Sequence, residues 1–430
     1  MRKATAMEGL PRTRLEQVIK SRGLSTSGVV REFNHRATAL GIDATVSPST
    51  LHRWVSGAER PRVGSQKVLE DWFSEPAGVL LGCPHSVPAK AICSVEDLVM
   101  TSGHESAEHA FAAAAAAIDP VAVENLQAQV ERQARRFNTT PTFTVMRDLV
   151  VLRDRVYDQL DRTDKPRQKA ELFLAAGQIC GLISVASLDL GYADAAEQQA
   201  RAALTYGQLI EHQSLQGWAR ALLATVAYWS GRPHKAVDSA EGGLAVTTAA
   251  TVRAQLHSLT ARALGQIGAR EEVAQQLHAA ENELDRAGAD PLFDGIGGEM
   301  RFDLLRYSVC AAAAYISLGD GAAAETASDN ALAQFSTGES TRLAVLAAQT
   351  DLATARTLRG DLAGAQQALG PLLEIDTERR TERLTQRAVA LGRLLGVNRF
   401  HGAAEARTLG LTLEDFTRAS LPRTIPAALP

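Results

Sequence analysis

The sequence predicts an all-α protein with a small N-terminal helical domain and a larger array of helical hairpins. Three observations favour this fold class. Ala dominates the composition while aromatic residues make up only 5%, which suits closely packed helices better than sheets. The first 75 residues carry apolar side chains at helical spacing, and from residue 119 a glycine-terminated helix pair recurs. At 430 residues the chain also exceeds the usual size of a single core, so several domains or a repeat array are expected.

Residues 10–75 are expected to form a compact domain of four amphipathic helices. In each segment the apolar residues fall on one face of a helix, and in the third segment they recur at i, i+3 and i+4. The residues predicted to face inward are Leu15, Val18, Ile19, Val29, Val30, Phe33, Leu51, Trp54, Val55, Val68, Leu69, Trp72 and Phe73. Gly23 is expected to end the first helix, and Ser25 is expected to cap the second.

The stretch SPSTLHRWVSGAERPR, residues 47–62, predicts the third helix in detail. Ser47 is a good N-cap, and Pro48 suits the first helical position because the N–H that it lacks has no partner there. With the apolar residues turned inward, the solvent side is predicted to carry Ser49, Thr50, His52, Arg53 and Ser56. Gly57 is expected to end the helix, and Arg60 and Arg62 follow it on a stiff loop.

Charge is distributed unevenly along the chain. Residues 1–75 hold 12 Lys and Arg against 8 Asp and Glu, a balance of +4. The formal net charge of the whole chain is −4, so the remaining residues carry −8. A locally basic domain on an acidic body fits a nucleic-acid contact that is made by the N-terminal domain alone.

Residues 76–118 are predicted to be a linker, because helical periodicity weakens there and small residues accumulate. Beyond it, residues 119–419 repeat a simple pattern in which a helix ends at a glycine and a small apolar residue follows five positions later. The glycines are Gly191, Gly231, Gly268, Gly319 and Gly360. The pattern favours helical hairpins stacked into a solenoid, with a plain helical bundle as the alternative. The glycine-rich residues 295–299 are expected to form a loop between repeats.

Residues 24–62 resemble the DNA-binding domain of lambda-repressor-like (Xre) helix-turn-helix regulators. The resemblance lies in LSTSGVVREF for the second helix and in VSPSTLHRWVSGAERPR for the third helix with its trailing Trp-x-x-Gly and Pro. The stretch NHRATALGIDAT is longer than the tight turn usual in that motif. The segments LDLGYADAAEQQARAALTYGQLI and AYWSGRPHKAVDSAEGGLA are similar to the tetratricopeptide-like domain fused to such regulators of the actinobacterial type.

The resemblance implies a cytoplasmic, sequence-specific transcriptional regulator that binds double-stranded DNA. It places base reading on Pro48, Ser49, Thr50, His52 and Arg53, with His52 also suited to phosphates, and phosphate contacts on Thr26, Arg60 and Arg62. The repeats would form a homodimer, bind a peptide or small-molecule effector at residues that the sequence does not identify, or do both. One alternative is a scaffold or adaptor whose N-terminal domain binds protein. Another is an enzyme-like sensor, which needs a polar pocket.

Catalytic, cofactor and metal sites are not expected from the motifs. The histidines of HESAEH, residues 104–109, are spaced i, i+5 and therefore do not lie on the same face of a helix. Cys83, His85 and Cys93 lack a fourth metal ligand at a regular spacing. No phosphate-binding glycine loop, nucleophile elbow or Cys-x-x-Cys pair occurs. Scattered cysteines, with no signal peptide or apolar run of transmembrane length, predict a cytoplasmic protein that does not contact membranes.

Overall fold

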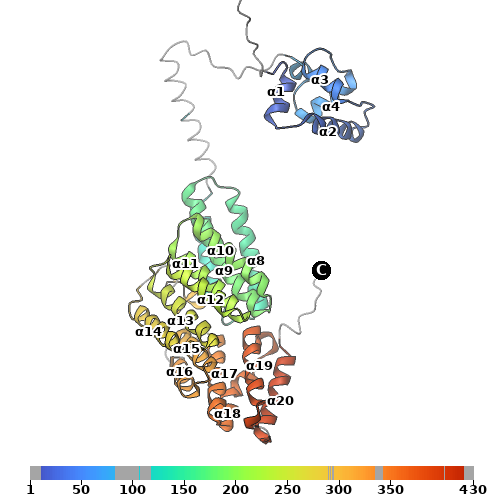
Figure 1. Ribbon diagram of the computed structural model, residues 1–430. Helices are drawn as coiled ribbons and strands as arrows, with labels where there is room; N and C mark the ends of the chain where they lie inside the picture. Colours follow the sequence, from blue (N-terminus) through green and yellow to red (C-terminus); the bar gives the residue numbers. More distant parts are fainter. Residues whose placement is uncertain are drawn as a thin grey trace, which may run out of the picture. The chain divides into compact units, whose positions relative to one another are not determined.

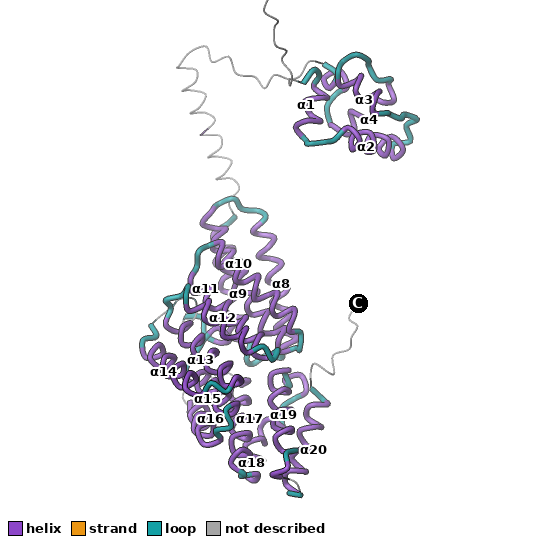
Figure 2. Tube along the Cα trace, viewed as in Figure 1, coloured by secondary structure: helices purple, strands orange, loops and turns teal. Residues whose placement is uncertain are grey.

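The computed structural model describes residues 11–82, 106, 118–288, 290, 292, 295–334, 342–400 and 402–420. These residues form helices, turns and loops and contain no strand, so the protein is all-α as predicted (Figure 2). The chain divides into two compact units, residues 1–108 and residues 109–430. Each unit is described by itself.

The N-terminal unit contains the four predicted helices and a short fifth one. The helices are α1 (Arg14–Ser21), α2 (Thr26–Ala39), α3 (Pro48–Val55), α4 (Val63–Phe73) and α5 (Ala77–Leu80) (Figure 1). Most of the predicted inward-facing residues are buried in one core, while Ile19, Val30, Val55 and Trp72 are partly buried against it. At its centre the rings of Phe33 in α2 and Trp54 in α3 meet edge to face, with 5.7 Å between their centroids.

The predicted helix ends of this unit are confirmed. The Ser25 hydroxyl accepts a hydrogen bond from the Gly28 N–H, and the Ser47 hydroxyl accepts one from the Thr50 N–H. Gly57 follows α3 with φ of +74°, a left-handed conformation that a side chain would strain. The local chemistry of the sequence therefore sets where α2 and α3 start and where α3 stops.

The packed part of this unit continues past residue 75, where the sequence placed the start of a linker. Leu80 in α5 is fully buried in the core, and the Arg14 N–H donates to the Gly82 carbonyl at 3.0 Å. A helix of four residues is too short to show periodicity in the sequence, so the glycine and proline around it dominated the prediction.

The second unit consists of helices from α7 onward. They are α7 (Pro120–Arg136), α8 (Thr142–Leu160), α9 (Pro166–Asp189), α10 (Ala193–Leu209), α11 (Gln213–Trp229), α12 (Pro233–Leu244), α13 (Ala250–Ile267), α14 (Arg270–Asp285), η1 (Gly298–Met300), α15 (Leu304–Ser317), α16 (Gly321–Gln334), α17 (Arg342–Arg359), α18 (Leu362–Leu373), η3 (Thr377–Arg379), α19 (Glu382–Leu395), η4 (Asn398–Phe400) and α20 (Ala404–Arg418). The glycine-rich residues 295–299 lie between α14 and α15, where the sequence predicted a loop, although Gly298 and Glu299 belong to the short helix η1.

The glycine pattern that predicted helical hairpins marks real helix ends. Gly191, Gly231, Gly268, Gly319 and Gly360 all follow a helix with φ between +69° and +91°. In every case the residue five positions later lies in the next helix and is at most 1% exposed. The glycine thus reverses the chain at low conformational cost, and the small residue lets the second helix pack closely on the first.

The first helices of the successive pairs form a continuous row. Helix α9 packs against α11, α11 against α13, α13 against α15, α15 against α17, and α17 against α19. The second helices α10, α12 and α16 each pack between the first helix of their own pair and that of the next pair. Helix α19 also contacts α9, so the row curves back on itself within this unit.

An ion pair joins the two ends of this row. Arg383 in α19 donates from Nε and Nη2 to the two carboxylate oxygens of Asp189 in α9, at 2.5 and 2.8 Å. The side chain of Asp189 is 0% exposed. Burial raises the pKa of the Asp189 carboxyl, and the adjacent Arg383 guanidinium opposes this rise.

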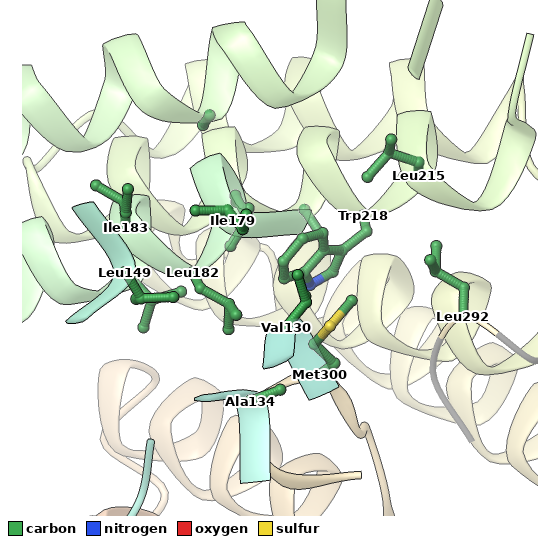
Figure 3. Packing of buried hydrophobic residues seen from close by; sticks show 14 of the residues in the cluster. Val130, Ala134, Leu149, Ile179, Leu182, Ile183, Leu215, Trp218, Leu292 and Met300 are labelled. Atoms are coloured by element: carbon green, nitrogen blue, oxygen red, sulfur yellow. The ribbon is translucent and has the colours of Figure 1, made fainter. Parts of the chain in front are cut away.

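Helix α9 lies at the centre of the largest core (Figure 3). Gly181 in α9 gives room to Trp218 in α11, because a Cβ at Gly181 would lie 2.2 Å from the indole ring. By length and composition α9 could cross a membrane, which corrects the expectation that the chain has no apolar run of that length. Most of this apolar surface is buried against neighbouring helices, which accounts for its composition.

Candidate nucleic-acid interface

Helix α3 presents its predicted polar side to solvent. Pro48, Ser49, His52 and Arg53 are exposed and Thr50 is partly exposed. On the opposite side, a Leu and a Trp anchor the helix in the core. The structure therefore brings all five predicted base-reading residues together on a single short helix whose position is fixed from behind.

The connection between α2 and α3 is shorter than the sequence suggested and is pinned to α2. The first six residues of NHRATALGIDAT belong to α2, so the connection runs only from Leu40 to Ser47. The Asn34 side chain donates from Nδ2 to the Val46 carbonyl at 3.2 Å and accepts from the Val46 N–H at 2.8 Å. This pair of hydrogen bonds fixes the backbone one residue before the N-cap of α3. No sequence pattern indicated this role of Asn34.

The other end of α3 is held by α1. The buried hydroxyl of Thr13 donates to the Val55 carbonyl at 2.8 Å and also caps α1 by accepting from the Glu16 N–H. Both ends of α3 are thus tied by side chains of other helices, and the orientation of its exposed face is set by the fold of the domain.

The residues expected to contact phosphate are exposed at helix starts and in one loop. Thr26 is the first residue of α2, where backbone N–H groups favour anions. Arg60 and Arg62 lie between α3 and α4, on either side of Pro61. Pro61 is buried, and its carbonyl accepts a hydrogen bond from Gln66 Nε2 at 2.7 Å. The buried proline holds the loop while both arginine side chains stay in solvent.

Arg53 has an intramolecular partner that the sequence did not suggest. Its Nε lies 2.9 Å from a carboxylate oxygen of Glu59, with the two side chains 56% and 46% exposed. Such an exposed ion pair contributes little to stability, so it can be exchanged for a stronger bidentate partner. In the free protein this contact gives Arg53 a preferred orientation next to the other exposed residues of α3.

Among the described residues, no group of three or more His, Cys, Asp or Glu is arranged to hold a metal ion. Cys180 and Cys310 are free thiols and are buried. Cys83, His85, Cys93 and both histidines of residues 104–109 lie outside the described part of the chain.

No protein-family model matches the chain, and the curated proteins contain no match to it. What the structure itself defines is an all-α protein of two compact units. The smaller unit presents a capped helix with an exposed polar and basic face, and the larger one is a row of helical hairpins that curves back on itself.

Proposed function

We propose that this protein is a cytoplasmic, sequence-specific DNA-binding regulator of transcription. In this proposal the N-terminal unit is a helix-turn-helix domain of the Xre type, and the second unit is a tetratricopeptide-like solenoid that pairs two copies of the chain and receives an effector. The observation that carries the proposal is the exposed face of α3, on which Pro48, Ser49, Thr50, His52 and Arg53 stand together while Trp54 anchors the helix.

The chemistry of this face suits the major groove of double-stranded DNA. A single helix fits the groove, and an arginine can donate to both O6 and N7 of guanine. The short side chains of Ser49 and Thr50 allow close approach to base edges. Arg60 and Arg62, held outward by the buried Pro61, are suited to phosphates on the adjoining backbone.

If Arg53 reads a base and Arg62 binds a phosphate, replacing each of them should lower the affinity for DNA in a different way. Arg53→Ala in the full chain should cost about 1–3 kcal/mol on the preferred sequence and relax the preference at one base position. Arg62→Ala should weaken all sequences alike and reduce the dependence of affinity on salt, because one phosphate contact is lost. Selection from random-sequence duplexes measures the base preference. Salt titrations of the selected and scrambled sites then measure the affinity and its dependence on salt.

Arg132→Ala is the matched control for these two variants, since it removes an equal charge from an exposed position on α7 in the second unit. It should leave preference and salt dependence unchanged. If Arg53→Ala and Arg62→Ala lower affinity equally without altering the preferred sequence, the two assigned roles are wrong. A full chain with no salt-dependent affinity for any duplex favours a protein-binding adaptor instead.

Pairing of two chains through the second unit predicts a preference for paired half-sites. Two N-terminal units on one dimer should favour related half-sites about one helical turn, or a multiple of it, apart. Light scattering of the full chain should give twice the chain mass, and moving the half-sites by half a turn should weaken binding. A monomer that binds one half-site as tightly as a pair contradicts this arrangement.

A further inference from the structure

The second unit contains a cavity of about 130 Å³ among the first helices of its pairs. Its apolar wall includes Trp218, Leu222 and Val226 of α11, Leu259 of α13, Phe302 and Val309. A dry cavity of about 150 Å³ with such a lining is large enough for benzene. The space therefore fits an apolar body about the size of one six-membered ring.

Arginines also reach this cavity, and three of them have a carboxylate partner. The pairs are Arg383 with Asp189 at 2.5 Å, Arg387 with Asp351 at 2.9 Å, and Arg306 with Glu299 at 2.6 Å. Arg262 of α13 is the fourth arginine of the wall, and among the described residues it has no ion-pair partner within 4.0 Å. Four guanidinium groups thus stand against three carboxylates, and Asp351, the ion-pair partner of Arg387, is also the carboxylate whose charge acts on Arg262.

The Arg262 side chain is buried and held, yet part of it has no partner. The residue is only 6% exposed, and its Nε and Nη2 make no hydrogen bond with any residue that the structure describes. Its guanidinium lies 4.2 Å from the ring centroid of Tyr228 and 5.3 Å from that of Trp229. It also interacts with the Tyr228 hydroxyl and the Cys310 thiol, but neither group satisfies Nε or Nη2. Buried charged donors without an acceptor are costly, and native structures rarely keep them without a reason.

The two atoms without partners are the pair that binds a carboxylate side-on. Arg383 uses the same two atoms, Nε and Nη2, to hold both oxygens of Asp189 in this unit. The indole Nε1 of Trp229, whose ring lies beside Arg262, is also buried without an acceptor. One Asp351 oxygen is without a partner too, but that carboxylate forms its ion pair with Arg387 and none with Arg262.

We propose that this cavity binds a small organic carboxylate with a compact apolar body. The carboxylate accepts hydrogen bonds from Arg262 Nε and Nη2, and the apolar body lies against Trp218, Leu222 and Phe302. The site rests on the second unit alone and does not depend on the proposed DNA binding. If the chain is a regulator, this ligand is the effector, and the cavity size favours a small molecule over a peptide.

Isothermal titration calorimetry of the full chain with benzoate, in the absence of DNA, tests the site. Benzamide and benzylammonium are the matched probes, because they keep the ring but remove or reverse the charge. Benzoate should bind, benzamide should bind at least about tenfold more weakly since charge-assisted hydrogen bonds are lost, and benzylammonium should not bind. Arg262→Met should abolish the preference for benzoate, whereas Arg132→Met, which removes an exposed arginine, should keep it.

Ala347→Leu provides a second variant that retains Arg262. Ala347 lines the cavity and is 7% exposed, so a larger side chain there should fill the space and weaken benzoate binding. The Ala347→Leu result tests the site even if Arg262→Met does not fold. Circular dichroism shows whether Arg262→Met folds. The proposal is overturned if millimolar benzoate does not bind, if benzoate and benzamide bind equally, or if folded Arg262→Met binds benzoate like the original chain. These outcomes leave the DNA-binding proposal untouched, because no DNA is present.

Discussion

Replacing Arg383 with methionine is expected to destabilise the second unit by about 3–5 kcal/mol. The substitution leaves the Asp189 carboxylate fully buried in α9 without the guanidinium that neutralises it. Methionine preserves much of the length and the apolar stem, so the loss comes chiefly from the uncompensated charge. Because this ion pair joins α19 to α9, the contact between these two helices should be lost as well.

Urea unfolding followed by circular dichroism measures the effect, and Arg393→Met is its matched control. Arg393 lies on the same helix α19 but is exposed, so its replacement should change stability by no more than about 0.5 kcal/mol. The double variant Asp189→Leu, Arg383→Met should lose less stability than Arg383→Met alone, since neither charge is then buried without a partner. If the double variant is the less stable of the two, the uncompensated charge is not the cause.

The sequence predicted the helices well wherever the determining chemistry is local. Ser47 and Gly57 bound α3 through their own hydroxyl and their own φ, so their positions in the chain were sufficient. The contact between α9 and α19 could not be predicted from local sequence, because it depends on the summed rotation of all the helix pairs between these two helices. Asp189 and Arg383 are 194 residues apart, and neither has a neighbour that indicates its partner.

The candidate DNA-binding face was predictable because it follows helical phase. Once Trp54 and the other apolar residues of α3 turn inward, Ser49, His52 and Arg53 must turn outward. The features that hold this face were not predictable. Asn34 bonds backbone groups of a loop beyond the end of its own helix, and Glu59 meets Arg53 only because the chain reverses at Gly57.

Arg262 in the second unit is another residue whose role could not be predicted from the sequence. In the sequence it is one arginine in an Ala-rich helix, and its spacing to the apolar residues of α13 does not distinguish it from a solvated side chain. Its burial follows from α13 being surrounded by α11, α12, α14 and α15. Its lack of a carboxylate partner becomes visible only when the other arginines of the cavity have been paired.

Trp54→Ala is expected to cost the N-terminal unit about 3–5 kcal/mol and to abolish the proposed DNA binding by the full chain. Trp54 is 3% exposed and meets Phe33 edge to face, so its removal opens a cavity between α2 and α3. For a small domain this is a large share of the total stability. The proposed base-reading residues would all remain in the chain, but the core that presents them would not hold α3 in place.

Trp72→Ala is the matched control, because it also removes an indole ring but leaves Trp54, which anchors α3, in place. Trp72 in α4 stacks on Phe73 with 4.6 Å between ring centroids, but it is only partly buried, so its removal should cost less than half as much and leave DNA binding measurable. Thermal unfolding and DNA titration of both variants in the full chain provide the comparison. In each, the second unit should unfold as in the original chain, because its core contains Trp218 and lies in a separate compact unit. If Trp54→Ala binds DNA as tightly as Trp72→Ala does, then the orientation of α3 is not what the proposed interface depends on, and another surface must carry the contact.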